Sequence, residues 1–259
     1  MTDVLITVLY SGVLLFLIAR SSRMIENSRR SVAVVFFLFA CVSLLASNLY
    51  WIVYDLMRPE TRMPFAANEI GEWAAFLLLS AVLNNAMQER FGDTGKETIC
   101  AALFSVACIC LWIAWSGEWI QDILAGAAFG YLLCTVVRAM KCAGALSLPQ
   151  WSILGIGATL LIGIEAGSFF VPEAWKAPLD LACSILMLAG ILFFLLKFYG
   201  EFRKEARPDA LLSLSFGGFT WAISSMYMSA DYYYIGVFLF SMVMLPLMLL
   251  ALKKEVEAA

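Results

Sequence analysis

Residues 31–57 read SVAVVFFLFACVSLLASNLYWIVYDLM, a stretch in which Asp55 is the one charged residue. A helix needs roughly 20 mostly apolar residues to cross about 30 Å of hydrocarbon, so this stretch predicts a membrane-spanning helix. The whole chain has a similar character, with 63% hydrophobic residues, 14% charged residues and a mean hydropathy of +0.87. Soluble domains are about 45–50% apolar and about 25% charged. We therefore expect an all-α polytopic membrane protein with a single transmembrane domain over 1–259.

Nine apolar runs are long enough to be candidate membrane spans. They lie near 4–20, 31–57, 66–88, 98–116, 119–140, 149–171, 178–198, 210–229 and 232–252. Two polar breaks decide this count, at Ser116–Gly117–Glu118 and at Ser229–Ala230–Asp231. Without each break, the joined segment would be about twice as long as one crossing needs. We expect each break to be the turn of a helical hairpin.

The basic residues predict how these spans are oriented. With the N-terminus outside, all of the 17 Lys and Arg residues except Arg58, Arg62 and Lys176 fall on the cytoplasmic side. The positive-inside rule expects this asymmetry. Basic residues follow the first apolar run instead of preceding it, unlike a secretory signal peptide. We expect a retained first helix, a cytoplasmic C-terminus and a plasma membrane, which the short loops and compact length suggest is bacterial.

The spans also suggest an internal repeat. The spacing from Pro64 to Pro178 is the shift that brings spans two to five onto spans six to nine. This predicts one helix at 4–20 followed by two parallel four-helix repeats, A over 31–140 and B over 149–254. Chance matching of hydropathy between helices is the alternative. A real repeat would place a ligand site where the two units meet.

The composition excludes several kinds of chemistry. The chain contains no histidine, so it has no histidine triad, histidine metal site or histidine proton shuttle. Its seven cysteines include no Cys-x-x-Cys pair and are typical of small packing residues. We expect no cofactor, no metal site and no nucleic-acid partner.

Polar residues gather where the second and third spans approach the outer surface. Each span carries amide, acidic and tryptophan side chains at helical spacings of three and four residues, and the two spans form a hairpin. Charged and amide groups inside spans are costly and usually mark function. The candidate ligand-binding or proton-coupling residues here are Asn48, Trp51, Asp55, Asn68, Glu69, Glu72 and Trp73.

Glu165, in the sixth span, is the remaining candidate. It lies between Gly163 and Gly167, which allow a neighbouring helix to approach closely. A carboxylate buried there can exchange a proton or pair with a cation.

A purely structural interpretation of these residues stays open. Acids near helix mouths often face water or lipid headgroups, and Trp and Tyr at those depths form the ordinary aromatic belt. Arg58 or Arg62 can neutralise Asp55 or Glu69 as a structural ion pair.

Small residues elsewhere have similar alternatives. Gly126 and Gly130 predict helix packing. Gly217–Gly218 and Pro246 predict either breaks in the last two spans or packing contacts.

Three classes of function fit this pattern. The first is a transporter or channel with an acidic, aromatic-lined outer site for a cation or small cationic molecule, and with Glu165 coupling a proton. The second is a membrane sensor that binds an extracellular ligand and contacts a cytoplasmic protein through its basic inner face. The third and least favoured is an intramembrane enzyme with paired carboxylates. We favour the first, with the lipid bilayer and a small cation as partners, and a cytoplasmic protein or a second copy as further ones.

Overall fold

The computed structural model describes residues 2–27, 31–57, 67–87, 95–203, 210–225 and 233–258. These stretches contain nine α-helices and no β-strand, so the predicted all-helical architecture is confirmed. In chain order the helices are α1 (Thr2–Asn27), α2 (Val32–Met57), α3 (Ala67–Ala86), α4 (Lys96–Ser116), α5 (Trp119–Cys142), α6 (Leu148–Ser168), α7 (Glu173–Phe202), α8 (Ala210–Ser225) and α9 (Tyr233–Ala258).

Local sequence explains where several helices begin and end. α4 ends before Gly117, whose φ of 76° lies in the left-handed region that glycine adopts without strain. At the start of α6, the Ser147 N–H donates to Gln150 Oε1 over 3.0 Å, as in a capping box. The break predicted around Gly117 is therefore a tight turn between two helices. The break predicted at 229–231 lies outside the described residues, between the separate helices α8 and α9.

α7 differs from its predicted span. It begins at Glu173, so Pro178 lies inside the helix and not at its mouth. Proline lacks the N–H that would bond the carbonyl four residues earlier. The helix tolerates this because every residue from Glu173 to Pro178 is exposed, at the very start of α7.

The surface of the bundle suits lipid better than water. Among the described residues, six helical segments are long and apolar enough to cross a membrane: Leu5–Glu26, Val32–Tyr54, Lys96–Ser116, Trp119–Cys142, Leu148–Ser168 and Glu173–Glu201. A shorter apolar segment covers Ala210–Ile223. Large apolar side chains such as Phe16, Leu103 and Ile153 are exposed on the outside. A surface of this kind is typical of a polytopic membrane protein.

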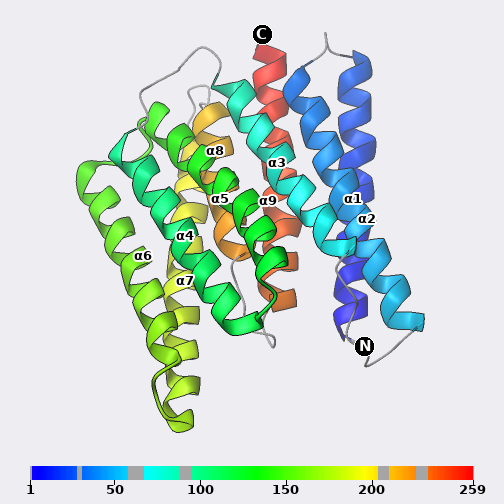
Figure 1. Cartoon of the computed structure of the whole chain (residues 1–259). Coiled ribbons are helices and arrows are strands. Elements are labelled where there is room, and N and C mark those ends of the chain that lie inside the picture. Colours follow the sequence, from blue (N-terminus) through cyan, green and yellow to red (C-terminus); the bar gives the residue numbers. More distant parts are fainter. Residues whose placement is uncertain are drawn as a thin grey trace.

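The helices run in alternating directions, and the two termini lie at opposite ends of the bundle (Figure 1). Their contacts define two rings. In the first ring, α1, α2, α3, α8 and α9 each contact the next, and α9 contacts α1. In the second ring, α4, α5, α8, α7 and α6 each contact the next, and α6 contacts α4. α8 belongs to both rings and joins them.

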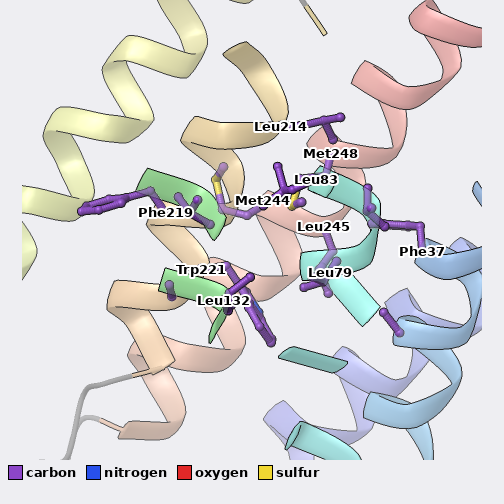
Figure 2. Close-up of a cluster of buried hydrophobic side chains, with 14 of the residues drawn as sticks. Phe37, Leu79, Leu83, Leu132, Leu214, Phe219, Trp221, Met244, Leu245 and Met248 are labelled. Atoms are coloured by element: carbon purple, nitrogen blue, oxygen red, sulfur yellow. The ribbon is translucent and has the colours of Figure 1, made fainter. Parts of the chain in front are cut away.

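A cluster of buried apolar side chains lies where the first ring meets α5. Figure 2 shows it with side chains from α2, α3, α5, α8 and α9, namely Phe37, Leu79, Leu83, Leu132, Leu214, Phe219, Trp221, Met244, Leu245 and Met248. Inside a bilayer, helices associate largely through van der Waals packing of such surfaces.

The glycine pair of α8 belongs to this packed region. α8 continues through Gly217–Gly218, and α9 continues through Pro246, so neither helix is broken there. A Cβ atom on Gly217 would lie 2.7 Å from Met248 Cγ of α9, which identifies the glycine as a packing residue.

The predicted repeat is not confirmed by these contacts. Repeat A would comprise α2 to α5 and repeat B α6 to α9, so α3–α5 and α7–α9 should correspond. α3 contacts α5, whereas α7 makes no contact with α9 within the described parts of the two helices. The repeat stays a prediction.

Candidate functional site

Glu69 and Glu72 stand on the first turns of α3, and both are partly buried. The Gln121 side-chain amide, at the start of α5, donates a hydrogen bond to Glu69. Glu69 therefore lies between α3 and α5. Glu72 follows three residues later, and the two carboxylates are close enough to interact electrostatically. Residues at this spacing share a helix face, which places both acids on the side of α3 that contacts other helices.

Close packing at Gly71 brings α2 against this acidic turn. A Cβ atom on Gly71 would lie 2.7 Å from the Ser43 carbonyl oxygen and 2.9 Å from Ser47 Cβ, so glycine is required for this approach. In two antiparallel right-handed helices, the residues that follow a contact pair turn to the same side of the pair. Asn48 and Glu72 follow Ser47 and Gly71. The contact therefore turns Asn48 and Glu72 toward the same side of α2 and α3.

Asn48 is a buried residue with an unsatisfied donor. It is 5% exposed, and its Nδ2 has no hydrogen-bond partner in the described part of the chain. An unpaired buried polar group costs about 1–3 kcal/mol. Such groups in native proteins commonly pair with a bound water, ion or ligand. An acceptor bound beside Asn48 would remove that cost.

A hydrogen-bonded cluster joins side chains of α1, α8 and α9 near Glu72. Tyr10 of α1 is within electrostatic reach of Glu72, and its hydroxyl is hydrogen-bonded to Ser241 of α9. Ser241 Oγ accepts a hydrogen bond from Trp221 Nε1 of α8 over 2.9 Å. We call Glu72, Tyr10, Ser241 and Trp221 the polar junction. It belongs to the first ring of helices.

Three members of the polar junction are absent from the residues predicted by sequence. A lone Tyr, Ser or Trp in an apolar helix is an ordinary packing or belt residue. One signal is present nonetheless, because Thr7, Tyr10 and Ser11 recur at helical spacing in the first span and all three are buried. A buried polar face in an apolar helix indicates contact with polar groups of other helices.

The remaining candidates near the hairpin are only partly placed. Trp51 and Trp73 are partly buried, and Trp73 packs against the hydrophobic core. The side chains of Asp55 and Asn68 lie outside the described residues, as do Arg58 and Arg62. Their membership of the site stays a prediction.

Glu165 lies in another part of the molecule. Within the described chain, α6 contacts α4 and α7 but makes no contact with α3. Glu165 is hydrogen-bonded to Cys183 of α7 and lies near Cys108 of α4. It therefore belongs to the second ring. The structure does not bring it together with Glu69 and Glu72.

The close helix approach expected at Gly163 and Gly167 is wrong. A Cβ atom on either glycine would have nothing within 4 Å, and α6 has no buried residue. Glycine permits close approach but supplies no attraction of its own, so its effect depends on a neighbouring helix. Gly130 of α5 has such a neighbour, since a Cβ atom there would lie 2.9 Å from Ser105 Cβ of α4. The packing role predicted for Gly126 and Gly130 is confirmed.

The opposite end of the bundle carries different contacts. Lys141 Nζ lies 2.6 Å from Glu97 Oε2 and ties the end of α5 to the start of α4. Asn84 Nδ2 donates to the Tyr131 hydroxyl over 3.1 Å, between α3 and α5. The carboxylate pair of α3 therefore lies at the end of the bundle opposite to Lys141.

Several tryptophans and cysteines have structural roles. Trp115, Trp119 and Trp175 are exposed at helix ends, as the aromatic-belt interpretation expects. The seven cysteines are all free thiols. Among the described residues, no group of three or more Cys, Asp or Glu side chains is arranged to hold a metal ion.

Comparison with family models, curated proteins and solved structures finds no match to this chain. Function is therefore inferred from the geometry of the carboxylates and the polar junction.

Proposed function

We propose that this chain is a membrane transporter or channel with an outward-facing site for a cation or small cationic molecule at Glu69 and Glu72. In this proposal all nine helices cross a plasma membrane, with the N-terminus outside. Six long apolar segments support membrane insertion, and the uneven placement of Lys and Arg supports the orientation. Termini at opposite ends of the bundle fit an odd number of crossings (Figure 1).

We base the function on one observation, the carboxylate pair of α3. α3 packs against α2, α5 and α8, so Glu69 and Glu72 stand among helices and not on an isolated surface. Two nearby carboxylates repel each other unless a proton or a cation accompanies them. Intramembrane acids that face a bundle interior typically mark ion or substrate pathways.

The neighbouring groups suit a polar cation. Asn48, on the same side of the α2–α3 pair as Glu72, has an unpaired N–H that can donate to a bound water or to an acceptor atom of a small cationic molecule. Trp51 and Trp73 offer aromatic faces that attract cations. Glu165, beside Cys183 in the second ring, supplies a separate acid for proton coupling.

Cation uptake into liposomes that contain the purified chain tests this function. Glu72→Gln removes one charge at nearly constant volume. We expect uptake to fall roughly tenfold or more, because a contact to a charged group contributes about 1.5–3 kcal/mol. The matched control is Glu173→Gln, since Glu173 is 86% exposed and pairs with its neighbour Lys176 at 2.7 Å. This control should keep wild-type uptake.

Two results would contradict the proposal. Uptake that survives the combined Glu69→Gln and Glu72→Gln substitutions would show that these two carboxylates do not form the cation site. A cation that raises the melting temperature of the wild-type chain, but not of Glu72→Gln, without any flux would support the sensor instead.

A further inference from the structure

Three buried side chains form a hydrogen-bonded chain across α8, α9 and α1. Trp221 Nε1 donates to Ser241 Oγ over 2.9 Å, and Ser241 is hydrogen-bonded to the Tyr10 hydroxyl. An indole N–H can only donate. Ser241 therefore accepts from Trp221, and its hydroxyl is hydrogen-bonded to Tyr10 as well. The three side chains thus connect α8 to α1 through α9.

α3 contacts α8, which carries the Trp221 end of this hydrogen-bonded chain, and lies within electrostatic reach of the Tyr10 end. Glu72 is within electrostatic reach of the Tyr10 hydroxyl. One helical turn later, the Phe76 ring lies beside the Trp221 indole with centroids 5.1 Å apart. Residues four apart share a helix face, so the face of α3 that carries Glu72 is the face toward Tyr10 and Trp221. Figure 2 shows Trp221 within the buried cluster at this place.

We propose that Tyr10 is a positioning residue that couples the charge on Glu72 to the contacts of α9 with α1 and α8. When Glu72 is ionised, the Tyr10 hydroxyl is attracted to the carboxylate while it stays hydrogen-bonded to Ser241. When a proton or cation neutralises Glu72, that attraction is lost. Tyr10, Ser241 and Trp221 then readjust together, because bonds in a buried network depend on one another.

This coupling rests on the proposed function and deepens it. A transporter must convert occupancy of its site into a change in helix packing, and a ligand does so only through contacts that differ between states. The polar junction supplies such contacts between α3, which carries the acids, and α8, which joins the two rings.

The other titratable groups around Glu72 are few in the described part of the chain. Glu69 lies on the same helix, Tyr10 on α1, and Cys41 of α2 lies close to Tyr10. The nearby α5 side chain is the neutral Gln121. α8 carries no charged residue, and the charged residues of α9 begin at Lys253.

A double-substitution cycle read by ¹⁹F NMR tests the coupling. Fluorotryptophan labels the eight tryptophans, and the Trp221 resonance is assigned by its loss in Trp221→Phe. We expect Glu72→Gln to move this resonance in the wild-type chain. In a Tyr10→Phe background, the same substitution should lose most of that movement, because the hydroxyl between Glu72 and Ser241 is missing.

Tyr131→Phe is the matched background. Its hydroxyl is also hydrogen-bonded to a side chain, Asn84 at 3.1 Å, but it lies outside the polar junction. Glu72→Gln should therefore move the Trp221 resonance by the full amount in this background.

Two outcomes would overturn the coupling: equal movement with and without the Tyr10 hydroxyl, or no movement on Glu72→Gln. If Tyr10→Phe does not fold, Ser241→Ala breaks the same chain at its next link and should have the same effect. The NMR measurements are made without any transported ion. If the Trp221 movement depends on the Tyr10 hydroxyl but no cation flux is found, the proposed function is contradicted and the coupling is supported. If cation flux is found but the movement does not depend on that hydroxyl, the coupling is contradicted and the proposed function is supported.

Discussion

Glu72 and Glu165 have different surroundings although both are acids within apolar helices. Glu72 lies within electrostatic reach of a second carboxylate and of a tyrosine hydroxyl, in the first ring. Glu165 is hydrogen-bonded to the Cys183 thiol, in the second ring. An acid near another acid favours a bound cation or a shared proton, whereas a thiol can donate a hydrogen bond to a carboxylate. We infer that the two acids have separate roles in transport.

Glu165→Gln tests this separation. We expect proton-driven uptake to fall to background, while the apparent affinity for the cation stays near that of the wild-type chain. The measurement is uptake over a series of cation concentrations, with and without an imposed pH gradient. A loss of cation affinity like that expected for Glu72→Gln would mean that the two acids act as one site.

At the scale of the helices, glycine has different effects on packing at Gly71 and at Gly163. Gly71 lies where α2 and α3 meet, and a Cβ atom there would lie 2.7 Å from a backbone oxygen, which cannot move without shifting α2. Gly163 lies on α6, where a Cβ atom would meet nothing within 4 Å. The α2–α3 contact therefore depends on glycine, and the exposed surface of α6 does not.

Gly71→Ala and Gly163→Ala form a matched pair. We expect Gly71→Ala to lower the free energy of unfolding by about 1–3 kcal/mol, the usual cost of overpacking. Gly163→Ala should change it by less than about 1 kcal/mol, in the stabilising direction, because alanine is the better helix former. Unfolding of the purified variants by a denaturing detergent measures both. Equal effects of the two substitutions would contradict the packing described for α2 and α3.

Across the bundle, the two ends carry different side-chain contacts. Glu69 and Gln121 meet at one end, and Glu97 and Lys141 meet at the other. Together with the helix alternation in Figure 1, this arrangement gives the proposed orientation a direct consequence for chemical labelling.

Single cysteines in a cysteine-free variant test the orientation. Glu118→Cys lies in the exposed turn between α4 and α5, and Leu148→Cys lies at the exposed start of α6. An impermeant thiol reagent added outside intact cells should label Glu118→Cys nearly completely and leave Leu148→Cys unlabelled until the membrane is opened. The opposite pattern would reverse the orientation, and labelling of both from outside would contradict the span between them.

Much of the helix pattern can be predicted from the chain alone. The predicted run 31–57 matches α2, and the break at Gly117 separates α4 from α5. Hydropathy predicts these features well because a bilayer leaves the backbone little choice except a helix of sufficient length. α7 is less well predicted, because its exposed first turns extend beyond the apolar run that hydropathy detects.

The candidate site is harder to predict for a physical reason. The spacing of Glu69 and Glu72 follows from the helix period, but their nearness to Tyr10 of α1 depends on lateral packing. Gly163 and Gly167 have the spacing of a packing motif, yet α6 brings no helix against them. Spacing within one helix predicts which residues share a face. It does not predict which helix that face will meet.

The amino-acid order alone therefore establishes an apolar, histidine-free helical chain, and it predicts most of its bases on alternate loops and a small set of acids in its spans. The tertiary structure alone brings Glu72 within electrostatic reach of Tyr10 and separates it from Glu165. The reason is that hydrophobicity, which favours apolar helices in a bilayer, does not discriminate between one apolar helix surface and another. Shape complementarity and hydrogen bonds between helices decide that pairing, and both arise only when distant parts of the chain are packed together.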